Sequence, residues 1–222
     1  MCERVGTVAR VRKLARIARK VRRRRSPELA RQELLDAAER LFANLPPDQV
    51  GLKDIGREAE VSHALVTHYF GTYDNLVEAV FERRTRDLRT RVLDRLAVGG
   101  VTQAAQLIDL LFTTFEDPVH LRLMKWLIAS ERNNVEGALA LRHRGLGFVA
   151  EQVASALDPK PTAEFRREVE LALVTTVAAA FGYAATKVSL ASSIGQPVST
   201  ELDRGVRQTL TAMLQAYLRT KQ

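Results

Sequence analysis

Cysteine, glycine and proline are scarce in this chain, and each scarcity excludes a class of protein. The single cysteine, Cys2, excludes an internal disulfide framework and a cysteine-based zinc site. Twelve glycines and seven prolines among 222 residues leave long stretches without a helix breaker. Because Ala, Leu, Arg and Glu dominate the remainder, the composition favours helix over strand. Apolar and polar residues never alternate over a useful length, so we expect an all-α fold.

Long apolar runs are also missing. The longest uncharged stretch, residues 171–186, contains glycine and hydroxyl residues and is short for a bilayer span. The first residues lack the compact apolar segment and small-residue cleavage site of a secretory signal. We therefore expect a cytoplasmic protein with no membrane partner.

Motifs that carry catalytic chemistry are absent from the sequence as well. It contains no phosphate-binding glycine loop, no nucleophile elbow, no paired histidines on one helix face and no metal-ligand cluster. We therefore expect neither an enzyme nor a bound cofactor or metal.

Positive charge is present in excess, but it is concentrated at one end. Residues 1–31 contain 12 Lys and Arg against two acidic residues, whereas residues 32–90 contain seven basic and 11 acidic residues. We expect residues 1–25 to form a disordered basic arm, ending in four consecutive arginines, on a nearly neutral body. Such an arm indicates a polyanionic partner.

Breakers divide the rest of the chain into nine helical segments. Ser26, Pro27 and Glu28 predict the start of the first helix, which the Pro46–Pro47–Asp48 turn ends. The later segments are expected at residues 52–58, 62–69, 74–96, 101–116, 118–131, 136–157, 162–191 and 200–219.

Two short segments, 52–58 and 62–69, match the size of a helix-turn-helix. The residues that would lock the two helices together are apolar and suitably spaced: Ile55, Ala59, Val61 and Val66. The outward face of the second helix would carry His63, Ala64, Thr67 and His68, with Leu65 at its margin. By pattern alone the signal is moderate, because short helix pairs also occur in ordinary bundles.

Three motifs between Arg31 and Val80 carry a family resemblance: LLDAAERLFA, LKDIGREAEVS and THYFGTYDNLVEAV. This stretch resembles the tetracycline-repressor (TetR) family of bacterial transcriptional regulators. The resemblance implies an all-helical homodimer with an N-terminal DNA-binding domain and a larger C-terminal helical bundle that binds a ligand and forms the dimer. On this chain we expect the DNA-binding domain at residues 26–73 and the ligand-binding and dimerisation domain at residues 74–222.

The resemblance also assigns residues to the DNA contact. His63, Thr67 and His68 are expected to reach base edges or phosphates, and Leu65 to touch a thymine methyl group or pack inward. Lys53, Tyr69 and Tyr73 are expected to contact the sugar-phosphate backbone. Ser62 and Ala64, at the start of the second helix, are also expected to contact DNA. The alternative for each residue is a solvated helix face.

Two departures from the family pattern affect this expectation. Glu60 stands where the family usually has glycine, and a positive φ there would cost roughly 1 kcal/mol. Tyr73 replaces the usual lysine, so a positive charge is missing from the expected DNA-binding domain, which is already net acidic. We therefore expect the arm to supply phosphate contacts, chiefly through its consecutive arginines: Arg22, Arg23, Arg24 and Arg25.

The large domain is expected to provide both the dimer contact and a ligand pocket. Small residues in the segment 178–185 permit close helix approach, and the last helix has an apolar stripe: Leu202, Val206, Leu210, Met213 and Tyr217. By resemblance these two helices form the subunit contact of a homodimer that binds a palindromic operator. The alternative is that the same faces close the core of one subunit.

The expected pocket is an apolar cavity for a small hydrophobic molecule. Its candidate lining residues are Phe112, Phe115, Met124, Trp126, Leu127, Phe148, Thr176 and Phe181. Plain core packing is at least as good an explanation for each of them. The sequence thus predicts a DNA-binding repressor released by a small hydrophobic effector; the alternative is an architectural or anionic-surface binder that depends on its basic arm.

Overall fold

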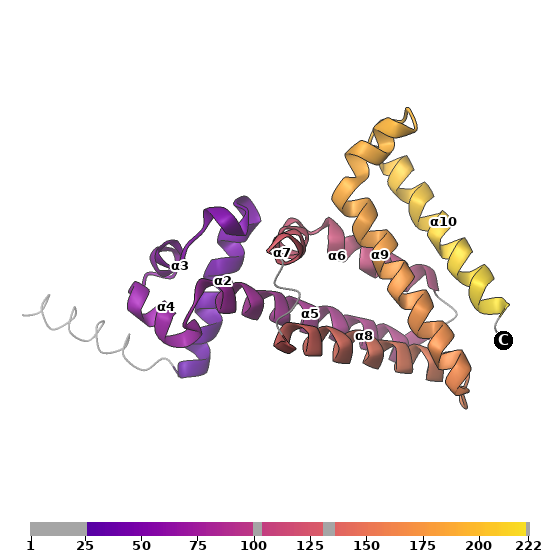
Figure 1. The fold of residues 1–222 in the computed structure, drawn as a ribbon, viewed down its shortest axis with the longest axis horizontal. Coiled ribbons are helices and arrows are strands. Elements are labelled where there is room, and N and C mark those ends of the chain that lie inside the picture. The colour runs from indigo at the N-terminus through magenta and orange to yellow at the C-terminus, as the bar shows by residue number, and fades with distance from the viewer. Residues whose placement is uncertain (1–25, 100–103, 131–135, 221–222) are drawn as a thin grey trace, which may run out of the picture.

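The computed structural model describes residues 26–99, 104–130 and 136–220. Within these ranges the regular structure consists of nine α-helices and one 3₁₀ turn, without strands, so the expected all-α fold is confirmed. A small head of three helices is joined by one long helix to a larger helical body (Figure 1). The basic arm, including Arg22 to Arg25, lies outside the described residues.

Helix α2 (Pro27–Asn44) begins where the sequence predicts. The Ser26 hydroxyl accepts a hydrogen bond from the Leu29 amide at 3.2 Å, and Pro27 and Glu28 occupy the first turn. The residue before Pro46 is in extended backbone, which ends the helix. One face of α2 is buried and supplies the centre of the head: Leu34, Leu35, Ala37, Ala38 and Phe42.

The head is completed by the 3₁₀ turn η1 (Pro47–Gln49), α3 (Leu52–Glu58) and α4 (His63–Phe70). Helix α5 (Tyr73–Gly99) contributes its first turns to the same core. Ile55, Val66, Leu76 and Val80 are fully buried against the apolar face of α2. Burial of this kind contributes about 1.5–3 kcal/mol for each large side chain, so the core fixes the orientation of the two short helices.

Helix α5 is the continuous connection between the head and the body (Figure 1). Near its start Leu76 and Val77 belong to the core of the head, whereas Val92 belongs to a second core with α8 (Glu136–Leu157). One unbroken helix therefore takes part in both cores and links the head to the body.

Four further helices complete the body: α6 (Ala104–Glu116), α7 (Pro118–Ala129), α9 (Ala163–Ser193) and α10 (Thr200–Arg219). Three of these helices have N-terminal caps whose side chains accept backbone hydrogen bonds: Asp117 caps α7, Thr162 caps α9 and Ser199 caps α10. A third core lies among α6, α9 and α10, where Phe112 and Phe115 pack against Ala180 and Tyr183.

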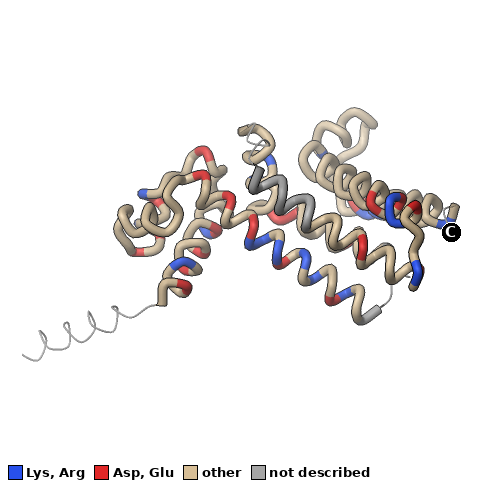
Figure 2. Tube along the Cα trace, turned by 60° about the horizontal axis from the view of Figure 1, so that its bottom comes forward, with Lys and Arg blue, Asp and Glu red and all other residues tan. Residues whose placement is uncertain are grey.

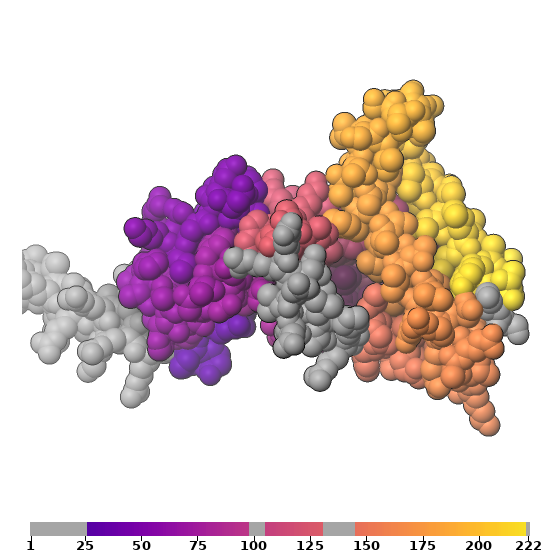
Figure 3. Space-filling view, in the orientation of Figure 1, coloured from indigo at the N-terminus to yellow at the C-terminus, as the bar shows by residue number. Residues whose placement is uncertain are grey.

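Helices α9 and α10 form a hairpin whose tip projects from the body (Figures 1 and 3). The predicted apolar stripe of α10 divides between two faces: Val206 and Leu210 pack against the core that contains Phe112, whereas Met213 is 64% exposed. Other large apolar side chains are exposed on α9 and at the tip: Leu171, Val174, Val188, Leu190, Ile194 and Val198.

Helix α9 is long and apolar enough to cross a membrane by length and composition alone. Such a test is also passed by core helices of soluble proteins. Here α9 packs against α6, α8 and α10, and its most apolar window is only 28% buried. Much of that window therefore lies on the surface of the chain.

Candidate DNA-binding surface and effector cavities

The turn between α3 and α4 is built from a few backbone contacts. The Asp54 carboxylate accepts a hydrogen bond from the Gly51 amide at 2.9 Å and so caps α3. After α3, Glu60 has φ 54°, so the turn adopts a positive φ at this position in spite of the Cβ atom, where the cost of that conformation suggested a slightly different turn. The Val61 amide then donates to the Gly56 carbonyl at 2.8 Å, and the Ser62 hydroxyl caps α4 by accepting from the Leu65 amide at 3.3 Å.

Gly56 allows this turn to be tight, a role that the sequence analysis did not assign. A Cβ atom at Gly56 would lie 3.1 Å from the Val61 carbonyl oxygen and 3.4 Å from the His63 amide nitrogen. A side chain there would push the second helix away from the first. The short spacing between a buried glycine and the turn is the signal that would have identified it.

Helix α4 has one buried and one exposed face. Val66 and Phe70 are buried in the head, as Ile55 is from α3. The side chains of Ser62, His63, Ala64 and His68 are exposed, while Leu65, Thr67 and Tyr69 are half-buried. The outward surface named in the sequence analysis is therefore accessible as one helix face; its contacts to DNA remain predictions.

Three of these side chains already have partners within the head. The Thr67 hydroxyl donates to the His63 carbonyl at 3.2 Å, which leaves its oxygen lone pairs available as acceptors. The Tyr69 ring packs against the core of the head and meets the His68 ring edge-on at 5.4 Å between centroids. Leu65 lies at the margin between the exposed and buried faces, as expected.

Tyr73 has a different environment from the one expected. Its hydroxyl donates a hydrogen bond to the Pro47 carbonyl, and its ring packs edge-on against Trp126 at 6.3 Å. Burial and the nearby carboxylates, Asp48 first among them, raise the pKa of this hydroxyl. The side chain therefore holds α5 against η1 and α7, and we no longer expect it to bind a phosphate.

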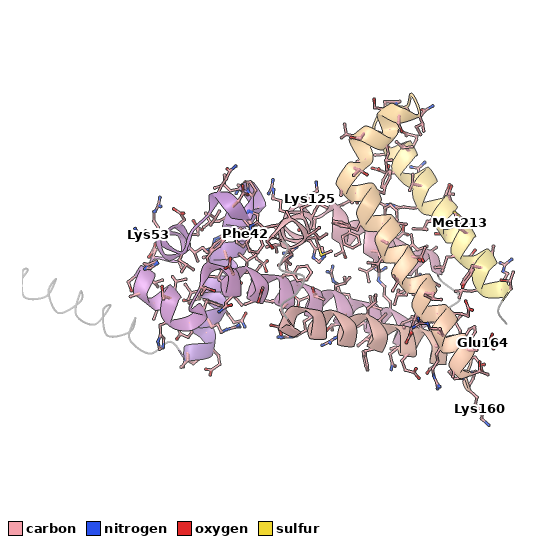
Figure 4. All side chains as sticks on the ribbon, in the orientation of Figure 1. Phe42, Lys53, Lys125, Lys160, Glu164 and Met213 are labelled. Carbon is pink, nitrogen blue, oxygen red and sulfur yellow. The ribbon has the colours of Figure 1, made fainter. Side chains whose placement is uncertain are left out.

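The charges near the outward face are largely balanced. Arg40 pairs with Glu58 at 2.6 Å, and Arg57 pairs with Asp54. Lys53 is exposed at the outer edge of the head (Figure 4) and has no ion pair with any residue that the structure describes. Figure 2 shows how few basic residues the head carries beside its acidic ones. Its own attraction for phosphates is therefore weak.

Charged contacts also attach the head to the body. Arg122 of α7 donates to the carbonyls of Phe42, at 2.7 Å, and Ala43 at the end of α2. Arg84 of α5 lies between Glu39 of α2, at 2.9 Å, and Asp117 of α7, at 2.7 Å. These partners lie far apart in the chain, so no local pattern could reveal them.

A groove of about 930 Å³ lies between α6, α9 and α10. Phe112, Phe115 and Tyr183 provide its aromatic part, while Asp203 and Arg207 belong to its charged part. The Tyr183 hydroxyl donates to Asp203 at 2.7 Å; burial together with this carboxylate raises the pKa of Tyr183 to about 12. This groove therefore combines aromatic with charged groups, whereas the sequence analysis expected an apolar cavity.

Phe112 and Phe115 are the predicted lining residues that border this groove. Trp126 packs instead against the core of the head, and Phe148 is 47% exposed on α8. The remaining candidates are buried or half-buried without lining the groove: Met124, Leu127, Thr176 and Phe181. Aromatic and methionine side chains at helical spacing fill cores by default, which accounts for the positions of these residues; a ligand contact at any of them stays a prediction.

Comparisons with known proteins agree on one family. The model for bacterial regulatory proteins of the tetR family matches residues 34–80. An uncharacterised HTH-type transcriptional regulator of Mycobacterium tuberculosis is 31% identical over 148 residues, 64% of this chain and 71% of that protein. The HTH-type transcriptional regulator BetI of Cronobacter sakazakii is 30% identical over 144 residues, 64% of this chain and 68% of that protein.

Solved structures show the same fold. A tetR-family transcriptional regulator from Streptomyces coelicolor has a TM-score of 0.61 at 22% identity, covering 88% of this chain and 89% of that one. GusR of Salmonella enterica has a TM-score of 0.58 at 17% identity, covering 88% of this chain and 98% of that one. At these identities the likeness concerns the fold alone.

Proposed function

Because the chain belongs to the TetR family of bacterial transcriptional regulators, we propose that it is a ligand-responsive repressor that binds a palindromic operator as a homodimer. The observation that carries this proposal is the exposed polar face of α4, held on a rigid core by Val66 and Phe70. A helix presented in this way fits the major groove of B-form DNA.

The proposed base contacts come from the first two turns of α4. His63 and Thr67 are one turn apart, so they lie on the same face of the helix. Ser62, Ala64 and Leu65 would line the approach to the groove. Lys53 of α3, with His68 and Tyr69 near the end of α4, would contact the flanking sugar-phosphate backbone.

The basic arm is proposed to supply most of the phosphate neutralisation. Residues 1–25 carry 11 basic side chains, whereas Arg40 and Arg57 of the head are paired with carboxylates. Release of counterions from DNA by such an arm would give steep salt dependence. The arm would strengthen binding at every sequence, and α4 would select the operator.

The dimer is proposed to form through α9 and α10. Between Glu170 and Lys187, α9 carries no charge, and its exposed positions include Leu171, Val174 and Ala178. Small and apolar residues on an uncovered helix face permit close packing of a second helix. A two-fold axis through this surface would bring two copies of α4 to the two half-sites of a palindrome.

The effector is proposed to bind in the groove between α6, α9 and α10. Its aromatic floor suits an apolar or aromatic ligand body, while its charged part, Asp203 and Arg207, would select for polar substituents. An effector seated there would contact α6, which joins directly to α7 and hence to the Arg122 contact with the head.

The experiment that tests DNA recognition is selection of operator sequences from a random duplex pool, followed by affinity measurements on the selected duplex. His63→Ala and Thr67→Ala are each expected to cost about 1–3 kcal/mol on the operator, with little change on unrelated DNA. Lys53→Ala should weaken binding to the operator and to unrelated DNA alike. Lys160→Ala, at the far end of the body (Figure 4), should change neither affinity.

A second part of this experiment uses the chain without the basic arm, residues 1–25. Its affinity should fall and its dependence on salt should become shallower, while its preferred sequence stays the same. If instead the His63 and Thr67 variants keep full sequence preference, the role of α4 is wrong. If the chain without residues 1–25 binds no DNA at all, and the full chain selects no preferred sequence from the random pool, the arm-driven binder is favoured.

A further inference from the structure

Residues 26–80, which hold α2, α3, α4 and the start of α5, contain only four cationic side chains. Arg40 and Arg57 are paired with carboxylates of the head. The other two, Arg31 of α2 and Lys53 of α3, form no ion pair with any residue that the structure describes. Lys53 has a proposed phosphate contact already, whereas Arg31 has had no role so far.

The Arg31 side chain is held in a defined place. Its guanidinium carbon lies over the Phe70 ring, 5.2 Å from the ring centroid. Phe70 is the last residue of α4 and is buried in the head. A guanidinium that stacks on an aromatic ring uses its flat face for the contact, so its N–H donors stay available at the edge. The stack therefore fixes a cation with unused donors at the C-terminal end of α4.

The backbone at this end of α4 does not need those donors. The Phe70 carbonyl accepts hydrogen bonds from the Thr72 amide at 2.8 Å and from the Asn75 side chain at 3.0 Å. Arg31 forms no hydrogen bond with any described residue. It is therefore not the C-terminal cap of α4, and its donors remain for an acceptor outside the chain.

Phe70 also lies on the same side of α4 as the two residues proposed to contact bases. His63, Thr67 and Phe70 are spaced by four and then three residues, which places them along one stripe of the helix. This stripe ends under the Arg31 guanidinium. A recognition helix in the major groove is flanked by the sugar-phosphate backbone. Arg31 thus lies where that backbone would pass the end of α4.

We propose that Arg31 binds a phosphate of the DNA backbone beside the C-terminal end of α4. This inference rests on the proposed function, because it requires α4 to enter the major groove. A guanidinium forms two parallel hydrogen bonds with one phosphate group, and the Phe70 ring orients it before DNA arrives. The contact reads no base. It fixes the position of α4 in the groove, so that His63 and Thr67 face the base edges.

The test measures the affinity of the full chain for the selected operator and for an unrelated duplex over a series of salt concentrations. Arg31→Gln should weaken binding to both duplexes about tenfold. It should also reduce the slope of log affinity against log salt by about 0.9 for each subunit bound. Arg31→Lys should keep the slope because the charge remains, but should lose part of the affinity, since an ammonium group cannot form the paired hydrogen bonds.

Arg40→Gln is the matched control, because it removes the same charge from the same helix. Arg40 is nine residues from Arg31, which places it on the opposite side of α2, where it pairs with Glu58. Its loss should change the affinity by less than about twofold and leave the salt slope unchanged. Thermal unfolding of both variants reports the purely structural alternative, in which Arg31 only covers the Phe70 ring: stability would then fall without any change of the slope.

Chemically altered operators locate the phosphate. A single methylphosphonate group, which is uncharged, is placed at each backbone position in turn. One position in each half-site should weaken binding of the native chain but not of Arg31→Gln, because the variant has already lost that contact. This position should lie outside the base pairs whose recognition changes in His63→Ala and Thr67→Ala.

Three results would overturn the proposal: a native salt slope in Arg31→Gln, an equal loss of affinity in Arg40→Gln, or no methylphosphonate position whose effect depends on Arg31. Failure of the proposed function has a different signature. The random pool would then yield no preferred sequence, or the His63 and Thr67 variants would keep the preference of the native chain. The salt slope on the unrelated duplex reports the Arg31 contact in either case.

Discussion

At the scale of single residues, Glu60 shows a local conflict that the fold tolerates. It has φ 54°, in the left-handed region that side chains with a Cβ atom disfavour. Glu60→Gly should therefore raise the free energy of unfolding by up to about 1 kcal/mol, reduced in part by the greater chain entropy of glycine. Urea unfolding measures this, with Glu60→Ala as a control that keeps the Cβ strain.

The two substitutions separate strain from side-chain contacts. Glu60→Ala and Glu60→Gly both remove the carboxylate, so the difference between them reports backbone strain less the chain entropy of glycine, without side-chain contacts. Equal stability of the two variants would mean that the turn relaxes to a negative φ and that the tight geometry around Gly56 is not enforced.

At the scale of helices, the local chemistry predicted where elements begin and end, but not what they touch. Ser26 and Ser62 cap α2 and α4 as expected, because a cap and its helix are neighbours in the chain. The environments of Tyr73 and Trp126 could not be anticipated, because their contacts form only when α5, η1 and α7 come together. The exposed face of α4 was predictable since its periodicity is local, whereas the groove lining was not.

The junction between α7 and α2 depends on one such contact. Arg122 donates to the last carbonyls of α2, where a cation also complements the helix dipole. Arg122→Met keeps the apolar stem and removes the donors, so it should lower stability by about 1 kcal/mol. Thermal unfolding would measure the loss, with Lys125→Met, an exposed position on the same helix (Figure 4), as the matched control.

The same pair of variants tests whether the contact joins head and body. Operator release by an effector should require a higher effector concentration in Arg122→Met than in Lys125→Met, since one link from α7 to α2 is missing. Identical release curves, together with identical stability, would show that Arg122 only covers the end of α2.

At the scale of the whole molecule, the proposed dimer surface on α9 and α10 would set the distance between the DNA-binding heads of two subunits. Val174 is 51% exposed and Met213 is 64% exposed, on the two helices of the projecting hairpin. If this surface packs against its copy, a charge placed on it would be buried at the dimer axis against a like charge. Burial of an unpaired charge costs several kcal/mol, so Val174→Glu combined with Met213→Glu should give a monomer.

Analytical ultracentrifugation measures that outcome, and Phe148→Glu, an equally apolar exposed position on α8, provides the control that should remain dimeric. The monomer should keep its helical content, because neither side chain belongs to a core. It should lose most of its operator affinity, since two half-sites one helical turn apart are then no longer bound as a unit. A dimeric double variant with normal operator affinity would place the two-fold axis elsewhere on the body.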